Sequence, residues 1–213
     1  PVEIVVWTNE EGARFSPAMM GSGVFAGIFE QADIYSHQDP EGITVEDELR
    51  RTKQLGETPC EIFPISAYYE LHIEQGPILE TENTCIGVVT GGQGSYWTHI
   101  TLNGQGSHAG TTPMNMRRDP MMGAARIIGG MREIVHKQTG AVGTVGRLET
   151  NPASINSIPG QVFFTVDTRH PDEKVLANIN LDLKKLVNSI CSEERLENDF
   201  TNIWKAPTIK FNK

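Results

Sequence analysis

The sequence predicts a small α+β domain inserted into a larger α/β domain. Residues 2–8 form a short apolar, β-branched run, which is typical of a strand covered on both faces. From about residue 90, strand and helix patterns follow in the order β-α-β-β-α-β, the ferredoxin-like arrangement. We therefore expect part of an α/β domain at 1–89, a ferredoxin-like domain at 90–206 and a return into the first domain at 207–213.

Two strands and two helices are expected in the α/β domain. The first strand is residues 2–8, and the Gly- and Met-rich residues 19–27 indicate a loop leading into a short helix. Residues 45–55 are polar and end at Gly56, which predicts a surface helix. Residues 67–73 alternate between apolar and polar side chains before a Gly-Pro turn, as a strand does.

The inserted domain is expected to hold four strands and two amphipathic helices. Asp119-Pro120 starts the first helix, with aspartate as N-cap and proline in the first turn, and Gly140 marks its end. Pro171-Asp172 starts the second helix. The strands are predicted at 96–102, 142–148, 161–168 and 196–204. At helical spacing, the apolar faces are Met121, Ala124, Ala125, Ile128, Met131 and Val135 in the first helix and Val175, Leu176, Ile179, Leu183, Leu186 and Ile190 in the second.

Composition excludes several classes of protein. A net charge of −9 argues against a nucleic-acid partner, which needs clustered Lys and Arg. No apolar run approaches the roughly 20 residues that span a membrane. The three cysteines are widely spaced, so we expect reduced thiols in a cytoplasmic protein rather than a disulfide framework. The chain opens in one predicted strand and stops where another begins, so a fragment of a longer protein is expected.

An acidic pair stands directly after the first predicted strand. Glu10 and Glu11 lie in Thr8-Asn9-Glu10-Glu11-Gly12, and catalytic groups of open α/β sheets gather at the carboxyl ends of strands. Neighbouring side chains point in different directions, so one carboxylate could bind a metal while the other faces water or substrate. Taken alone, the pair is more often a solvated acidic turn.

A histidine follows in the second predicted strand. His72 at a strand end suits zinc, and alternation places Glu70 and Glu74 on its face, where a carboxylate could orient the imidazole. Taken alone, His72 is more often a hydrogen-bonded structural histidine.

The inserted domain offers three further polar candidates. His108 lies in the glycine-rich loop 104–113, from which it could donate a hydrogen bond to a developing oxyanion. Arg169 presents a planar fork suited to a carboxylate, and Asn156 could add an amide contact to the same ligand. A flexible turn for His108 and a surface salt bridge for Arg169 are the plain alternatives.

Together these motifs resemble the M20 metallopeptidase superfamily, and within it the hydantoinase/carbamoylase branch. That branch holds N-carbamoyl-L-amino-acid hydrolases, β-ureidopropionases and allantoate amidohydrolases. The matching strings span nearly the whole chain, which makes them far more specific than any single motif. They are TNEEGARF (8–15), MMGSGVFAG (19–27), ELHIEQGPILE (70–80), GQGSHAGTTPMNMRRDP (104–120) and DTRHPD (167–172).

The resemblance implies a zinc-peptidase-like catalytic domain with a mixed sheet and two zinc ions, or manganese, cobalt or nickel in their place. It also implies a ferredoxin-like lid through which two chains dimerise. Matched positions make Glu10 the general base, Glu11 and His72 metal ligands, and His108 the residue that stabilises the oxyanion. The substrate-binding positions are Gln75, His108, Asn156 and Arg169. The expected reaction removes a carbamoyl group from a small ureido acid and releases ammonia and carbon dioxide.

The sequence also departs from the family pattern. The family's zinc pair uses an N-terminal His, a bridging Asp and a C-terminal His that this chain does not contain. We therefore expect the chain alone to bind zinc poorly and to be inactive. An aminoacylase or dipeptidase of the same superfamily is one alternative, although the histidine at position 72 argues against it. A non-catalytic dimerisation fragment is the other.

Overall fold

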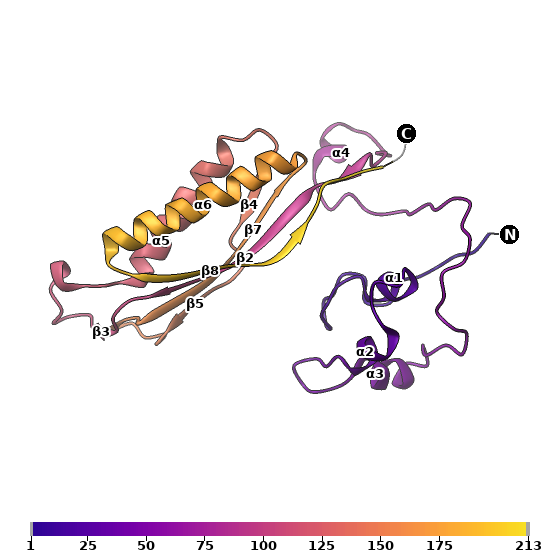
Figure 1. Ribbon diagram of the computed structural model, residues 1–213, viewed down its shortest axis with the longest axis horizontal. Coiled ribbons are helices and arrows are strands. Elements are labelled where there is room, and N and C mark those ends of the chain that lie inside the picture. Colours follow the sequence, from indigo (N-terminus) through magenta and orange to yellow (C-terminus); the bar gives the residue numbers. More distant parts are fainter. Residues whose placement is uncertain (1, 212–213) are drawn as a thin grey trace. The chain divides into compact units, whose positions relative to one another are not determined.

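A computed structural model describes residues 2–211 of the chain. The chain divides into two compact units, residues 1–73 and 74–213, and each has its own elements (Figure 1). Among the described residues, no helix is both long and apolar enough to cross a membrane.

The first unit is built from short helices around a small apolar cluster. Thr44 caps the third helix by accepting a hydrogen bond from the Asp47 amide, which satisfies one of the free N–H groups at a helix start. The buried cluster is Phe15, Met20, Ile34 and Val45. The three helices are α1 (Met20–Phe25), α2 (Gln31–Ser36) and α3 (Val45–Arg51).

The two strands predicted for this unit do not form. Residues 2–8 and 67–73, all described, lack strand pairing, and side chains such as Val2 and Leu71 are almost fully exposed. A strand needs a neighbour for its N–H and C=O groups and cover for its apolar face, and the described residues of the first unit offer neither to these segments. The helices predicted within 19–27 and 45–55 do form, the second ending at Arg51.

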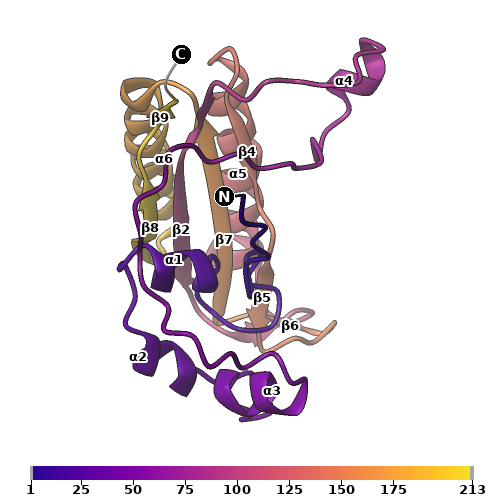
Figure 2. The same cartoon turned by 90° about the vertical axis from the view of Figure 1, so that its right-hand side faces the viewer.

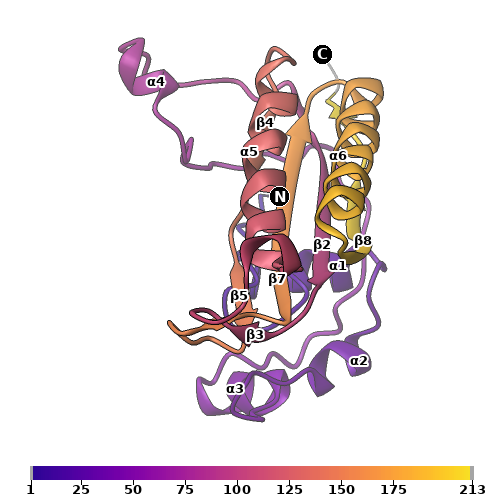
Figure 3. The same cartoon turned by 90° about the vertical axis from the view of Figure 1, so that its left-hand side faces the viewer.

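The second unit is a sheet with two helices packed across one face. The strand order is β4-β7-β2-β8, all antiparallel, and β5 also pairs with β7 beyond β4 (Figure 2). Helices α5 and α6 lie side by side over the sheet (Figure 3). In chain order the elements are α4 (Ile78–Thr81), β1 (Gly91–Gly92), β2 (Gly94–Asn103), β3 (Ser107–His108), a 3₁₀ turn (Met114–Met116), α5 (Pro120–His136), β4 (Val142–Thr144), β5 (Leu148–Asn151), β6 (Ser157–Ile158), β7 (Gln161–His170), α6 (Glu173–Glu194), β8 (Glu197–Ala206) and β9 (Ile209–Lys210).

Alternation along the strands and spacing along the helices build one core. Ile100, Val162 and Phe164 point from the sheet into the helices, and Ile127 and Leu183 face them; all five are at most 1% exposed. The strands predicted at 96–102, 161–168 and 196–204 are confirmed, and their ends agree with the prediction to within two residues.

Two details of the prediction are wrong. The single strand at 142–148 is two short strands, β4 and β5, which pair with opposite ends of β7. In α5 the buried face includes Ile127, whereas Ala125 is exposed, so the predicted stripe is rotated slightly about the helix axis.

Candidate functional site

The acidic pair lies on a turn fixed by Asn9. Asn9 has φ 50°, a left-handed conformation that asparagine tolerates better than most residues. Its side-chain amide donates hydrogen bonds to the carbonyls of Phe15 (2.9 Å) and Pro17 (3.1 Å). The carbonyl of Glu10 accepts from the Met19 amide at 2.7 Å. The carboxylates of Glu10 and Glu11 therefore project from a braced turn.

His72 lies in an exposed segment within reach of these charges. Its Nδ1 is 2.6 Å from the carbonyl oxygen of Ile73, which can only accept, so Nδ1 donates and the neutral ring keeps its lone pair on Nε2. This hydrogen bond is the main reason that the pKa of His72 is raised, and the negative charges of Glu10, Glu70 and Glu11 raise it further.

The carboxylates expected to orient His72 have other partners. The Tyr68 hydroxyl donates to Glu70 at 2.7 Å, and Glu74 accepts from the Ile78 and Leu79 amides at the start of α4. The backbone carbonyl of Ile73 takes the orienting role instead.

The donor types fit a metal, but their number does not. An imidazole nitrogen and carboxylate oxygens are normal zinc ligands, and a catalytic zinc normally has three protein ligands. Within residues 2–211, no three His, Cys, Asp or Glu side chains converge as a metal site requires. Glu11 and His72 therefore do not complete a metal centre by themselves.

His108 and Asn156 meet on a small ribbon at one end of the sheet. Strand β3 pairs with β6 so that His108 lies opposite Ser157, and the Ala109 amide donates to the Asn156 carbonyl at 3.0 Å. Both side chains are exposed. The Asn156 side-chain oxygen accepts from the Ser154 hydroxyl at 2.7 Å. The structure thus brings two of the predicted substrate-binding residues together.

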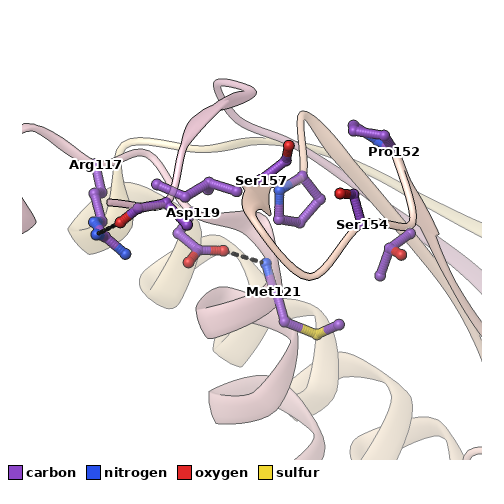
Figure 4. Close-up of a pocket in the computed structure, with 10 residues that line it drawn as sticks. Arg117, Asp119, Met121, Pro152, Ser154 and Ser157 are labelled. Carbon is purple, nitrogen blue, oxygen red and sulfur yellow. Dashed lines mark hydrogen bonds between the residues drawn. The ribbon is translucent and has the colours of Figure 1, made fainter. Parts of the chain in front are cut away.

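A hollow of about 300 Å³ lies beside this ribbon (Figure 4). Arg117, Asp119, Ser154 and Ser157 are among its lining residues. Asp119 is occupied as the N-cap of α5, where it accepts from the Met121 amide at 2.9 Å, as predicted from the sequence. Arg117 was not a predicted site residue. The signal that could have found it is a pair of arginines in a loop whose backbone carbonyls need donors.

Arg169 lies at the other end of the same sheet. On β7 it pairs with Ser95, whereas Gln161 pairs with Asn103 at the end that carries the ribbon. Eight residues of β-strand cover about 26 Å. The Arg169 guanidinium contacts Asp167 at 2.8 Å, and this carboxylate raises the pKa of Arg169. Within one chain, Arg169 and His108 are therefore far apart.

Gln75 occupies an exposed turn before α4, in the left-handed region at φ 54°. The turn belongs to the second unit, whereas Glu10, Glu11 and His72 belong to the first. The shared site predicted for these residues stays a prediction.

The second unit resembles a domain found in one family of known proteins. Residues 90–195, which include every strand of the sheet except β8, helices α5 and α6 and the His108 ribbon, match the peptidase dimerisation domain of the M20 family. The chain belongs to the M20 metallopeptidase superfamily, in its hydantoinase/carbamoylase branch.

Three relatives illustrate this membership. An N-carbamoyl-L-amino-acid amidohydrolase of Rhizobium meliloti is 46% identical over 92% of this chain and 47% of its own length. A probable allantoate deiminase of Oryza sativa subsp. japonica is 35% identical over 92% of this chain and 45% of its own. The crystal structure of a hydantoinase/carbamoylase family amidase from Burkholderia multivorans aligns with TM-score 0.84 at 46% identity, over 97% of this chain and 51% of that one. The chain thus spans about half the length of these relatives.

Proposed function

We propose that this chain forms the lid and part of the catalytic domain of a metal-dependent amidohydrolase that acts on ureido acids. The reaction removes the carbamoyl group of an N-carbamoyl amino acid or a related compound and yields the free amine, ammonia and carbon dioxide. The observation that carries the proposal is the joining of two distant segments in the first unit. Trp7 donates a hydrogen bond to Tyr68, which is 61 residues away in the sequence. The negative charges of Glu10 and Glu11 raise the pKa of His72 across a similar sequence separation.

Each predicted residue has a role in this proposal. Glu10 accepts a proton from the attacking water and passes it to the departing nitrogen, an acid–base role worth about 10²- to 10⁴-fold. His108 donates a hydrogen bond to the carbonyl oxygen as that atom gains negative charge. Arg169 binds the substrate carboxylate, and Gln75 and Asn156 add polar contacts that orient the substrate.

Two zinc ions, or manganese, cobalt or nickel in their place, are the cofactors we expect in the full-length protein, with Glu11 and His72 among their ligands. The described residues do not complete either metal position. We therefore expect the 213-residue chain by itself to bind zinc weakly and not to turn over substrate.

In this proposal the chain contributes to two domains, a catalytic domain and a lid. We assign 1–89 and 207–213 to the catalytic domain and 90–206 to the lid. The strand order β4-β7-β2-β8 with two helices on one face supports a ferredoxin-like lid. Free thiols at Cys60, Cys85 and Cys191 support a cytoplasmic location.

A homodimer through the lid is part of the proposal. A ureido acid is far shorter than the ~26 Å of strand between the His108 ribbon and Arg169. One chain therefore cannot place both residues on one substrate molecule. A second copy, related by a two-fold axis, can supply His108 and Asn156 to the site that holds Arg169.

Two alternatives remain testable. The absence of a three-ligand metal cluster among residues 2–211 favours a non-catalytic dimerisation module for this chain, in which only the lid acts. An aminoacylase or dipeptidase is the alternative within the superfamily, and the histidine at position 72 is the feature that opposes it.

The decisive experiment assays the full-length protein with added zinc. We expect ammonia release from N-carbamoyl amino acids, no hydrolysis of N-acetyl amino acids, and a loss of about 10²-fold or more in Glu10→Gln. Hydrolysis of the acetyl substrates alone would replace the proposal with an aminoacylase. A zinc-free dimer without either activity would replace it with the dimerisation module.

A further inference from the structure

The Arg117 side chain forms hydrogen bonds with the turn that follows His108. Its Nε donates to the carbonyl of Thr112 at 3.1 Å. Its Nη2 donates to the carbonyl of Ala109 at 2.8 Å (Figure 4). A single planar guanidinium therefore holds both ends of the 109–112 turn. The Thr112 amide closes the same turn by donating to the His108 carbonyl at 3.3 Å.

Inside this turn, a backbone amide determines which nitrogen of the neutral His108 ring carries the proton. The Gly110 N–H donates to His108 Nδ1 at 3.0 Å. A backbone amide can only donate, so Nδ1 carries the lone pair and the proton of the neutral ring is on Nε2. The His108 side chain is exposed, so this N–H is available to an acceptor outside the ribbon.

Arg117 is in turn tied to the helical layer of the same unit. Its carbonyl accepts from Arg195 Nη2 at 2.8 Å, and Arg195 caps the C-terminal end of α6. The neighbouring Arg118 donates instead to the Arg195 carbonyl at 2.7 Å and contacts neither end of the turn. Two adjacent arginines thus have separate tasks, and only that of Arg117 concerns His108.

We propose that Arg117 is a positioning residue. By holding the 109–112 turn, it keeps the Gly110 amide on Nδ1, and so keeps His108 in the Nε2–H form aimed as a hydrogen-bond donor. The acceptor is the carbonyl oxygen of the ureido group, and this last step rests on the function proposed above. A lysine cannot replace Arg117, because an ammonium group lacks the planar fork that reaches two carbonyls.

The first test reads the histidine ring directly and needs no activity. Nitrogen-15 NMR of the 213-residue chain, with its histidines labelled, should show His108 protonated on Nε2 and unprotonated on Nδ1 at a pH where the ring is neutral. Arg117→Lys should convert this into a mixture of both tautomers. The matched Arg118→Lys should leave the ring signals unchanged.

The proposal is overturned if wild-type His108 carries its proton on Nδ1, or if Arg117→Lys keeps the wild-type ring signals. The wild-type measurement decides the first point even where the variant does not fold. If the NMR result is as expected but full-length protein hydrolyses no ureido acid, the positioning role stands and the proposed function fails.

The second test separates positioning from mere stabilisation. In the full-length enzyme, Arg117→Lys should lower kcat by up to about 100-fold with a much smaller change in KM, because a misaligned donor costs transition-state rather than ground-state binding. Arg118→Lys should keep wild-type kcat and KM. An equal loss in both variants, or a loss confined to KM, would contradict the assignment.

Discussion

Two histidines show how a backbone contact decides what an imidazole can do. His72 donates from Nδ1 to the Ile73 carbonyl, which leaves a lone pair on Nε2, the form that binds a metal. His108 accepts at Nδ1 from the Gly110 amide, which leaves a proton on Nε2, the form that donates to an oxyanion. The sequence indicated both histidines, but not these states, because each depends on one backbone hydrogen bond.

Asn9 allows a direct test of how the Glu10–Glu11 turn is braced. Asn9→Gly removes the two hydrogen bonds to Phe15 and Pro17 but tolerates the left-handed backbone, and we expect a loss of about 1–2 kcal/mol. Asn9→Ala adds the backbone cost, roughly 1 kcal/mol more. Urea unfolding followed by circular dichroism measures both variants. An alanine variant as stable as the glycine variant would contradict this explanation.

Acid should weaken the first unit through Glu48. Hydrogen bonding to Arg51, aided by the charge of Arg14, lowers the pKa of Glu48 from 4.5 to about 2. Because the folded pKa is below the unfolded one, this contribution to stability is present above about pH 4.5 and is lost as the pH falls toward 2. In Glu48→Gln, the thermal midpoint should be lower than that of the wild type at pH 7. It should fall less than that of the wild type as the pH is lowered from about 4.5 to 2. An unchanged pH dependence would rule out this role for Glu48.

At the scale of elements, local patterns were sufficient where an element packs within its own unit. Strands β2, β7 and β8 and helices α5 and α6 follow their predicted patterns because their apolar faces share one core. Residues 2–8 and 67–73 carry equally clear strand patterns and remain extended and exposed, because the described part of the first unit supplies no sheet for them to join. An apolar sequence pattern therefore shows which face of a strand or helix must be buried, but it does not show whether the chain provides a neighbouring element to bury it.

Neighbouring phenylalanines on β7 test which face of the sheet is the core. Phe164 is fully buried under the helices, so Phe164→Ala should cost about 3–5 kcal/mol. Phe163 lies on the opposite face, half-buried against His99 and Arg147, and its alanine variant should cost clearly less. Urea unfolding of the two variants gives the comparison. Equal costs would mean that both faces of the sheet are covered.

At the scale of the whole molecule, the candidate residues other than Gln75 fall into three groups. Glu10, Glu11 and His72 belong to the first unit, His108 and Asn156 to one end of the second unit's sheet, and Arg169 to its other end. The motifs that predicted these residues could not reveal this separation, because it depends on the register of β7. The distance makes a site shared between two copies a necessary part of the proposed function.

Mixing two inactive variants tests the shared site. In a symmetric dimer whose sites each combine Arg169 of one chain with His108 of the other, a heterodimer of Arg169→Ala and His108→Ala has one site with both substitutions and one with neither. Random mixing makes half of the dimers heterodimers, so we expect about one quarter of wild-type activity to return. Each variant alone should stay inactive. Mixing His108→Ala with Asn156→Ala should restore nothing, because the two residues lie on the same ribbon of the chain. Every ribbon in that mixture carries one substitution, so every site lacks one of the two residues. If Arg169 and His108 served the same site from one chain, the first mixture would also stay inactive, and the 26 Å of strand between them would have to be bridged by a rearrangement of the lid.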